Sequence, residues 1–139
     1  MEDGLHLFLR DRVEDVPDAA AQVADFAGMH GADTSDQFNL RLAIDELLTN
    51  VVSYGFPEKR GAEVHIHLAV RFKTGHLLIE LDDTGVPFNP LELPRPDTDS
   101  SLDDRAIGGL GIHFVRTLMN DMTYRREGGR NVTMLRYKI

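Results

Sequence analysis

The spacing of apolar and polar residues divides the chain into helical and extended segments. Between Asp15 and His30, alanine and valine recur mostly three or four positions apart, the spacing that gathers side chains on one face of a helix. Pro17 suits the first turn of such a helix, because proline lacks the N–H that this turn leaves unpaired. Gly31 suits its end. The pattern therefore predicts a helix over residues 15–30.

A longer apolar stripe predicts a second helix. Ser35 or Asp36 is suited to cap its first turn, because a short polar side chain can accept a hydrogen bond from a free backbone N–H. The stripe has the spacing of a buried helix face and consists of Leu40, Ile44, Leu47 and Val51. The helix is expected to end near residues 55–57, where glycine and proline follow.

The remaining segments favour strands, turns and one more helix. Strands are predicted from apolar alternation at residues 5–9, 63–72, 76–82, 122–127 and 131–137. Hairpin turns are predicted at residues 73–75 and 128–129. A third helix is marked by Ile112, Val115, Leu118 and Met119. This order of elements predicts a single α+β domain over residues 1–139, a two-layer sandwich with its helices on one face of the sheet.

Composition narrows the classes of protein. The chain has 139 residues, 42% of them hydrophobic, which fits one globular domain with a core of its own. It has no cysteine, which excludes disulfides and thiolate metal sites. Residues 1–4 lack the basic and apolar regions of a signal peptide, and no apolar run is long enough to cross a membrane; a cytoplasmic protein is expected. The net charge of −8 argues against nucleic acid as a partner.

Glu46 and Asn50 form the first candidate site. Residues four apart on a helix lie about 40° from each other around its axis, so both side chains share one face. A carboxylate can act as a general base, and an amide oxygen can ligate Mg²⁺ without adding charge. The alternative is an exposed polar flank of the helix.

Two glycine-containing segments supply the other candidates. Asp83-Thr-Gly85 follows an apolar strand, where a carboxylate can accept a hydrogen bond from an exocyclic amine and glycine lets the backbone approach a flat ring. Gly109-Leu-Gly111 leads into the third helix, whose free N–H groups favour phosphate. The alternatives are an Asp-rich turn and a flexible connector.

The order of these motifs resembles the Bergerat-type, histidine kinase-like ATPase superfamily. Glu46-Leu-Leu-Thr-Asn50 resembles its N box, Asp83-Thr-Gly85 its G1 box and Gly109-Leu-Gly111 its G2 box. Within it, the chain resembles the bacterial anti-sigma-factor serine/threonine kinases over residues 5–139. The resemblance rests further on Ala43-Ile-Asp, Ile112 and the ending Asn131-Val-Thr-Met134. It implies the two-layer Bergerat sandwich with a mixed, mainly antiparallel sheet.

The resemblance also implies roles for single residues. Glu46 would be the general base, and Asn50 the ligand of Mg²⁺ beside the bound ATP. Asp83 would receive the adenine amino group, with Gly85 beside the ring and Thr133 near it. The residues whose backbone would meet the phosphates are Gly109, Gly111 and Ile112.

Residues 87–108 would be the ATP lid, since a loop of this length in a compact domain is usually functional or disordered. The chain departs from the family pattern at two positions. Pro87 replaces the second G1 glycine, which stiffens the first hinge of the lid, and Tyr54 stands where histidine is frequent. Arg105 lies in the lid within range of a γ-phosphate, or is a solvated charge. His65 and His67 alternate on one strand face and are read as solvent-exposed in preference to a metal pair.

The function implied is an ATP-dependent serine/threonine protein kinase that acts as an anti-sigma regulatory factor. Its partners would be an anti-sigma-antagonist protein and a sigma factor, with no direct nucleic acid and no membrane; a homodimer is compatible with the resemblance. One alternative is a nucleotide-gated binding module that sequesters a partner without phosphorylating it. The other is a detached histidine-kinase catalytic domain, which the absence of a phosphoacceptor helix pair disfavours.

Overall fold

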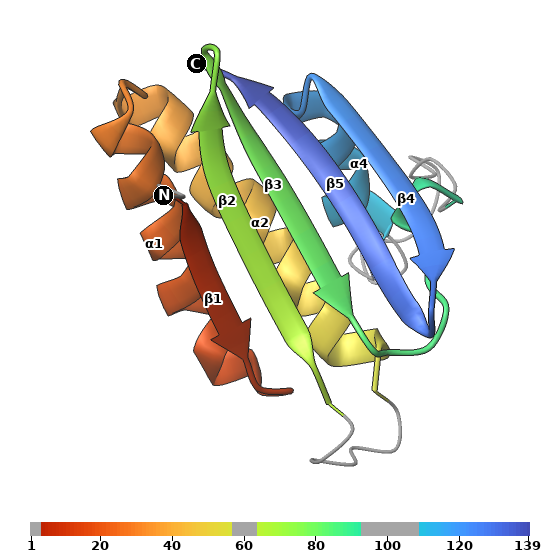
Figure 1. Ribbon diagram of the computed structural model, residues 1–139. Coiled ribbons are helices and arrows are strands. Elements are labelled where there is room, and N and C mark those ends of the chain that lie inside the picture. The colour runs from red at the N-terminus through yellow and green to blue at the C-terminus, as the bar shows by residue number, and fades with distance from the viewer. Residues whose placement is uncertain (1–3, 57–63, 93–108) are drawn as a thin grey trace.

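The computed structural model describes residues 4–56, 64–92 and 109–139 (Figure 1). In chain order its main elements are β1 (Leu5–Leu9), α1 (Val16–Met29), α2 (Thr34–Tyr54), β2 (Ile66–Lys73), β3 (His76–Asp83), α4 (Gly109–Leu118), β4 (Asp121–Glu127) and β5 (Arg130–Lys138). Short 3-10 turns lie at Val13–Asp15 and Pro90–Glu92. The predicted order of elements is confirmed.

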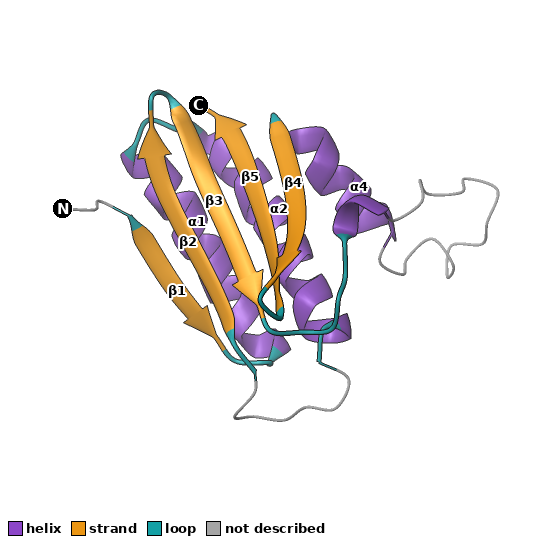
Figure 2. Ribbon diagram, turned by 45° about the vertical axis from the view of Figure 1, so that its right-hand side comes forward, coloured by secondary structure: helices purple, strands orange, loops and turns teal. Residues whose placement is uncertain are grey.

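The five strands form one sheet in the order β1-β2-β3-β5-β4. Each pairing between the described strands is antiparallel. The mainly antiparallel character of the sheet is confirmed, whereas the prediction of a mixed sheet is wrong for the part of the chain that the structure covers. The helices α1, α2 and α4 lie together on one face of the sheet (Figures 1 and 2). The predicted α+β two-layer sandwich is therefore confirmed.

The core lies between the helix layer and the inner face of the sheet. The apolar stripe of α2 is buried there as predicted, with Leu40 and Ile44 fully enclosed. Alternate residues of β2 and β3 point inward, so that each strand buries every second side chain. The inward row of β3 ends in Asp83 instead of an apolar residue. This alternation carries a carboxylate to the edge of the core.

The cap of α2 differs from the prediction. Asp33, one residue before the helix, accepts a hydrogen bond through Oδ1 from the Asp36 backbone N at 2.8 Å. The expected caps Ser35 and Asp36 lie inside the first turn instead. Asp33 is extended, with φ −79° and ψ 179°, which is the backbone conformation that allows a side chain to reach forward to the first turn.

The third helix begins earlier than its apolar residues suggested. It starts at Gly109, so Gly109 and Gly111 form its first turn and do not precede it. Of the predicted lid, residues 93–108 lie outside the described residues, while residues 90–92 form a 3-10 turn. Within the described ranges, no helix combines the length and apolar character needed to cross a bilayer.

Candidate active site

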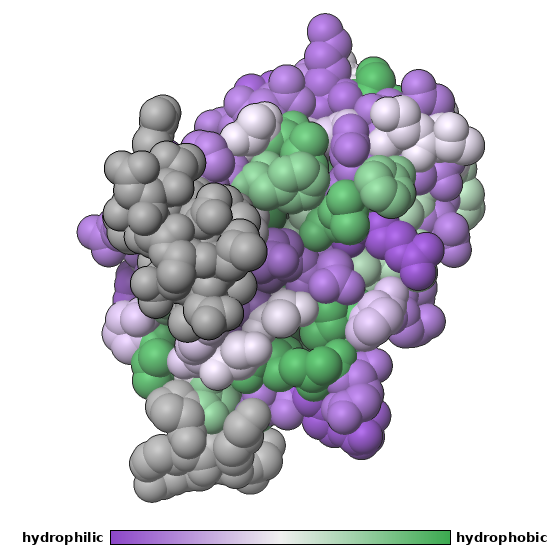
Figure 3. Space-filling view, turned by 180° about the vertical axis from the view of Figure 1, so that it is seen from behind, coloured by the Kyte–Doolittle hydropathy of each residue, from purple (hydrophilic) through white to green (hydrophobic). Residues whose placement is uncertain are grey.

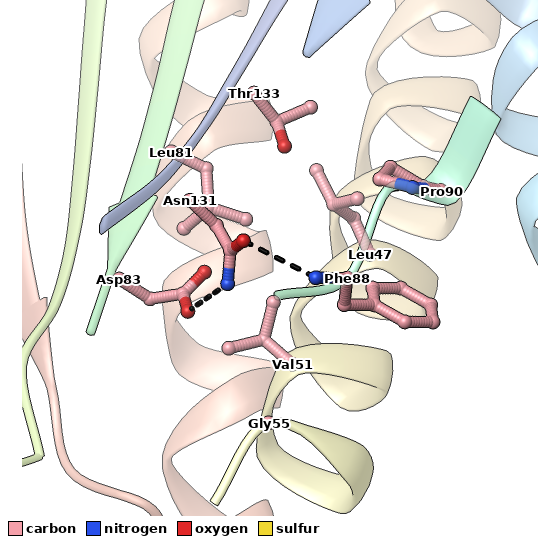
Figure 4. Close-up of a pocket in the computed structure, with 9 residues that line it drawn as sticks. All are labelled: Leu47, Val51, Gly55, Leu81, Asp83, Phe88, Pro90, Asn131 and Thr133. Atoms are coloured by element: carbon pink, nitrogen blue, oxygen red, sulfur yellow. Dashed lines mark hydrogen bonds between the residues drawn. The ribbon is translucent and has the colours of Figure 1, made fainter. Parts of the chain in front are cut away.

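A pocket lies between the inner face of the sheet and the C-terminal half of α2 (Figure 4). The sheet side is formed by Leu81, Asp83, Asn131 and Thr133, and the helix side by Leu47, Val51 and Gly55. Phe88 and Pro90, on the segment after β3, line the rest. The free volume is about 10 Å³, close to that of one water molecule. A purine ring therefore does not fit while the lining side chains keep these positions.

Asp83 is the buried acid of this pocket, with 4% of its surface exposed. Its Oδ1 accepts hydrogen bonds from the Gly85 backbone N at 2.9 Å and from Asn131 Nδ2 at 3.0 Å. Burial raises the pKa of Asp83 above its ordinary value. The hydrogen bond from Asn131 and, to a smaller extent, the one from Gly85 offset part of this increase. No described residue donates to Oδ2, which leaves this oxygen as an acceptor for a ligand.

Gly85 is enclosed by backbone and carboxylate oxygen. A Cβ at this position would lie 2.7 Å from the Gly55 carbonyl oxygen and 2.8 Å from Asp83 Oδ1. The next residue, Val86, donates its N–H to the same Gly55 oxygen at 2.9 Å. The turn after β3 therefore packs against the end of α2, and only glycine fits at its centre.

Thr133 lies on β5 opposite Leu81 and is buried among the pocket residues. Asn131, two positions earlier on the same inward face, was not predicted as a site residue. It is 4% exposed and donates to Asp83. The sequence carries two signals for it. Asn131 belongs to the ending that resembles the family, and its two-residue spacing from Thr133 places both on one face of a strand.

Glu46 and Asn50 are brought together as their spacing predicts. Asn50 is buried, and its Nδ2 donates to the Glu46 carbonyl oxygen at 2.8 Å and to Glu46 Oε2 at 3.2 Å. Both hydrogen bonds of the Asn50 side chain to described residues thus use nitrogen. Its Oδ1 is the atom that remains for a cation. Mg²⁺ prefers oxygen ligands and takes few of them from the protein.

The start of α4 lies directly against Glu46. A Cβ built on Gly111 would fall 1.9 Å from Glu46 Oε2, so glycine permits this approach of the two helices. Gly109, Gly111 and Ile112 are among the first four residues of α4, whose N–H groups have no partner within the helix. The Ile112 side chain is buried in the core, so its contribution to a ligand is limited to the backbone.

The two halves of the site offer different chemistry. The pocket around Asp83 presents one acceptor in an apolar slot, which suits a flat ring carrying an amine. The region around Glu46 and Asn50 combines a base, an amide oxygen and a helix N-terminus, which suit a phosphate chain with Mg²⁺. Among the described residues no three His, Asp or Glu side chains form a metal cluster.

Other predicted positions contribute less. Arg105 lies outside the described residues, and Tyr54 is 47% exposed at the end of α2. His65 and His67 are half-buried on the outer face of the sheet, less exposed than predicted. His67 lies 3.6 Å from an Asp82 oxygen and contacts His6 through ring nitrogens 3.1 Å apart.

Comparison with known proteins gives a consistent set of relatives. The profile of the family described as "Histidine kinase-like ATPase domain" matches residues 9–137. The serine/threonine-protein kinase BtrW of Bordetella bronchiseptica is 34% identical over 95 residues, which cover 68% of this chain and 66% of that protein. The match therefore spans just under two thirds of that relative. The serine-protein kinase RsbW of Staphylococcus aureus is 26% identical over 111 residues, which cover 77% of this chain and 69% of that protein.

Solved structures show the same fold. The crystal structure of the RsbU and RsbW domains of Rv1364c from Mycobacterium tuberculosis superposes with a TM-score of 0.68 at 18% identity. The superposition covers 97% of this chain and 32% of the mycobacterial chain. At this identity the likeness concerns the fold alone.

Proposed function

This chain belongs to the histidine kinase-like ATPase family, in the group of the serine-protein kinases, and from that premise we propose that it is an ATP-dependent serine/threonine protein kinase and anti-sigma regulatory factor. The observation that carries the proposal is the contact of Glu46 with the start of α4, beside Asn50. A nucleotide site needs an amide for Mg²⁺ and free N–H groups for phosphate. A carboxylate base in the same place is useful only if a proton is removed there.

The nucleotide binds across both halves of the site. Asp83 Oδ2 accepts the adenine amine, with Gly85 and Thr133 beside the ring. Asn50 Oδ1 would hold Mg²⁺, and the chemistry that the ion would supply is neutralisation of charge on the phosphate oxygens. The backbone of Gly109, Gly111 and Ile112 meets the phosphate chain.

Phosphoryl transfer then requires little covalent work from the protein. The hydroxyl oxygen of a partner serine forms a bond to the γ-phosphorus, while the bond from that phosphorus to the β–γ bridging oxygen breaks. ADP leaves with the electron pair. Glu46 takes the proton of the attacking hydroxyl, and Asn50 Nδ2, at 3.2 Å from Glu46 Oε2, orients the carboxylate.

The partner that brings the serine is an anti-sigma-antagonist protein, and a sigma factor is the second partner. Exposed apolar side chains on the helix layer support a protein partner. They include Phe38 and Leu42, one turn apart on α2, and Phe114 on α4. Figure 3 shows the face behind the sheet, where apolar patches interrupt a mostly hydrophilic surface. Such patches give a partner apolar area to bury.

The test incubates the purified chain with γ-labelled Mg-ATP and each candidate antagonist protein from the same genome. We expect label on one serine of one antagonist, located by mass spectrometry and lost when that serine is replaced by alanine. ATP binding without transfer to any antagonist would contradict the kinase proposal and favour the nucleotide-gated binding module. A chain that binds no ATP would contradict both.

A further inference from the structure

Asn131 is the most heavily hydrogen-bonded side chain of the pocket. Its Nδ2 donates to Asp83 Oδ1 at 3.0 Å and to the Val86 carbonyl oxygen at 2.9 Å. Its Oδ1 accepts from the Phe88 backbone N at 3.2 Å, from Arg126 Nη1 at 3.1 Å and from the Tyr124 hydroxyl. Figure 4 shows the amide between Asp83 and the segment that carries Phe88.

These partners decide which way the amide points. The nitrogen faces two acceptors and the oxygen faces three donors, so a flipped amide would oppose donors with donors. Both donor hydrogens of the amide are used. Because Asn131 is 4% exposed, water cannot replace a lost partner without rearrangement.

We propose that Asn131 is the positioning residue of the nucleotide site. It holds Asp83 by Oδ1, so that Oδ2 is presented to the exocyclic amine of an adenine ring. It also anchors the backbone on both sides of Pro87, at the start of the loop. This role rests on the proposed nucleotide site and extends it to a residue of β5.

The charges around Asp83 explain why an amide is suited to this position. Arg126 is the neighbouring cation, but its Nη1 bonds the Gly85 carbonyl oxygen at 2.8 Å and Asn131, not the Asp83 carboxylate. The hydrogen bonds to Asp83 therefore come from neutral N–H donors, while the charge of Arg126 favours the carboxylate without a direct hydrogen bond and Asp82 adds a nearby negative charge. An amide donates to Asp83 without tying up Oδ2 in an ion pair, as a cation in its place would.

The same amide compensates for Pro87. Proline offers no N–H, so the donors nearest to it are Val86 N, which bonds Gly55, and Phe88 N, which bonds Asn131. The Val86 carbonyl completes the link to Asn131. The path of the backbone through Pro87 is thus fixed from β5.

The test compares Asn131→Asp with Asn120→Asp in the full chain. Both variants exchange an amide for a carboxylate of nearly the same shape. Asn120 is exposed, and its Oδ1, which accepts from Lys138 N at 2.7 Å, is kept by aspartate. Calorimetry measures the Mg-ATP affinity of each protein at about pH 5 and about pH 8, because burial and like-charge repulsion both raise the second pKa of a carboxylate pair above the ordinary value of about 4.

In Asn131→Asp, two carboxylates share one buried site, and they hold one proton at the lower pH and repel each other at the higher. We expect its affinity to fall at least about tenfold more at the higher pH than at the lower, while wild type and Asn120→Asp change alike. An affinity equal to wild type, or a loss of the same size at both pH values, would overturn the proposal.

Two further measurements keep the outcome decisive. If Asn131→Asp does not fold, the test uses Tyr124→Phe, which removes one donor to Asn131 Oδ1. ATP binding should then weaken several-fold, and unchanged affinity would overturn the proposal.

If wild type binds no ATP, the proposed function fails. The role of Asn131 is then judged by carbon NMR titration of Asp83 without nucleotide. Its pKa should rise in Asn131→Asp and not in Asn120→Asp; equal titration would overturn the role.

Discussion

At the scale of single residues, two polar side chains of the candidate site each use one atom in hydrogen bonds with described residues and keep a second polar atom that bonds none of them. Asp83 accepts from described residues only through Oδ1, and Asn50 donates only through Nδ2. The fold thereby fixes both side chains before any ligand arrives. The two remaining oxygens are the ones assigned to adenine and Mg²⁺, which is the preorganisation that makes a polar contact specific.

Asp83→Asn tests the first of these oxygens. The amide oxygen can still accept from Gly85 and Asn131, so the fold should be retained. The new NH₂ replaces Oδ2 and opposes the adenine amine, which should weaken ATP binding by about 100-fold or more. Calorimetry measures this loss. Asp82→Asn is the matched control, since it removes the same charge from the outer face of the sheet, where Asp82 pairs with Arg130.

The same variant should also change the pH dependence of stability. Because burial raises the pKa of Asp83 in the folded chain, its contribution to stability is fully present below the unfolded pKa. That contribution is lost as pH rises through the folded pKa. Without nucleotide, Asp83→Asn should therefore gain thermal stability relative to wild type as pH rises above the ordinary aspartate pKa of about 4. If the melting temperatures of the two proteins changed with pH in the same way, this would contradict the burial of an ionisable Asp83.

At the scale of elements, the contact between α4 and α2 positions Glu46, the proposed base. Gly111 lets the first turn of α4 approach Glu46 more closely than a side chain would permit. Glu46 is also bonded by Asn50 from its own helix. The position of the carboxylate thus depends on both helices, while the sheet supplies the pocket at Asp83.

Gly111→Ala tests this contact. The new Cβ would displace the end of the Glu46 side chain, which is flexible, and alanine favours a helix by about 1 kcal/mol over glycine. Stability should therefore change little, while single-turnover phosphotransfer should fall by about 10²-fold. In a Glu46→Gln background the same substitution should cost much less, because the base is already absent. Equal rate losses in both backgrounds would show that Gly111 does not act through Glu46.

At the scale of the whole molecule, the sequence predicts the fold better than it predicts the site. The apolar stripe of α2 and the alternation of apolar residues in β2 and β3 indicate which face of each element is buried. The helix layer and the sheet layer can be predicted from these faces. The cap at Asp33 was missed because Asp33, Ser35 and Asp36 are all suitable residues, and only backbone geometry separates them. The start of α4 was placed too late because glycine disfavours helices, whereas close packing on Glu46 requires it.

The contacts within the candidate site were predictable where its residues follow one another in a motif. Glu46 and Asn50 are related by helix periodicity, and Asp83 and Gly85 by a turn after a strand. Asn131 was missed because its partners Asp83 and Val86 lie 48 and 45 positions away in the sequence. A polar residue at the start of a strand carries no local signal of that pairing, which arises only when β5 inserts between β3 and β4.

The central claim is that Glu46 removes a proton during phosphoryl transfer, and single-turnover kinetics with labelled ATP tests it most directly. Glu46→Gln keeps the shape of the side chain and removes its basicity, so ATP affinity should stay within a few-fold and the transfer rate should fall by about 10²–10⁴. Asp45→Asn, which removes the same charge from the preceding residue of α2, should transfer at the wild-type rate. Equal rates in wild type and Glu46→Gln would contradict the account.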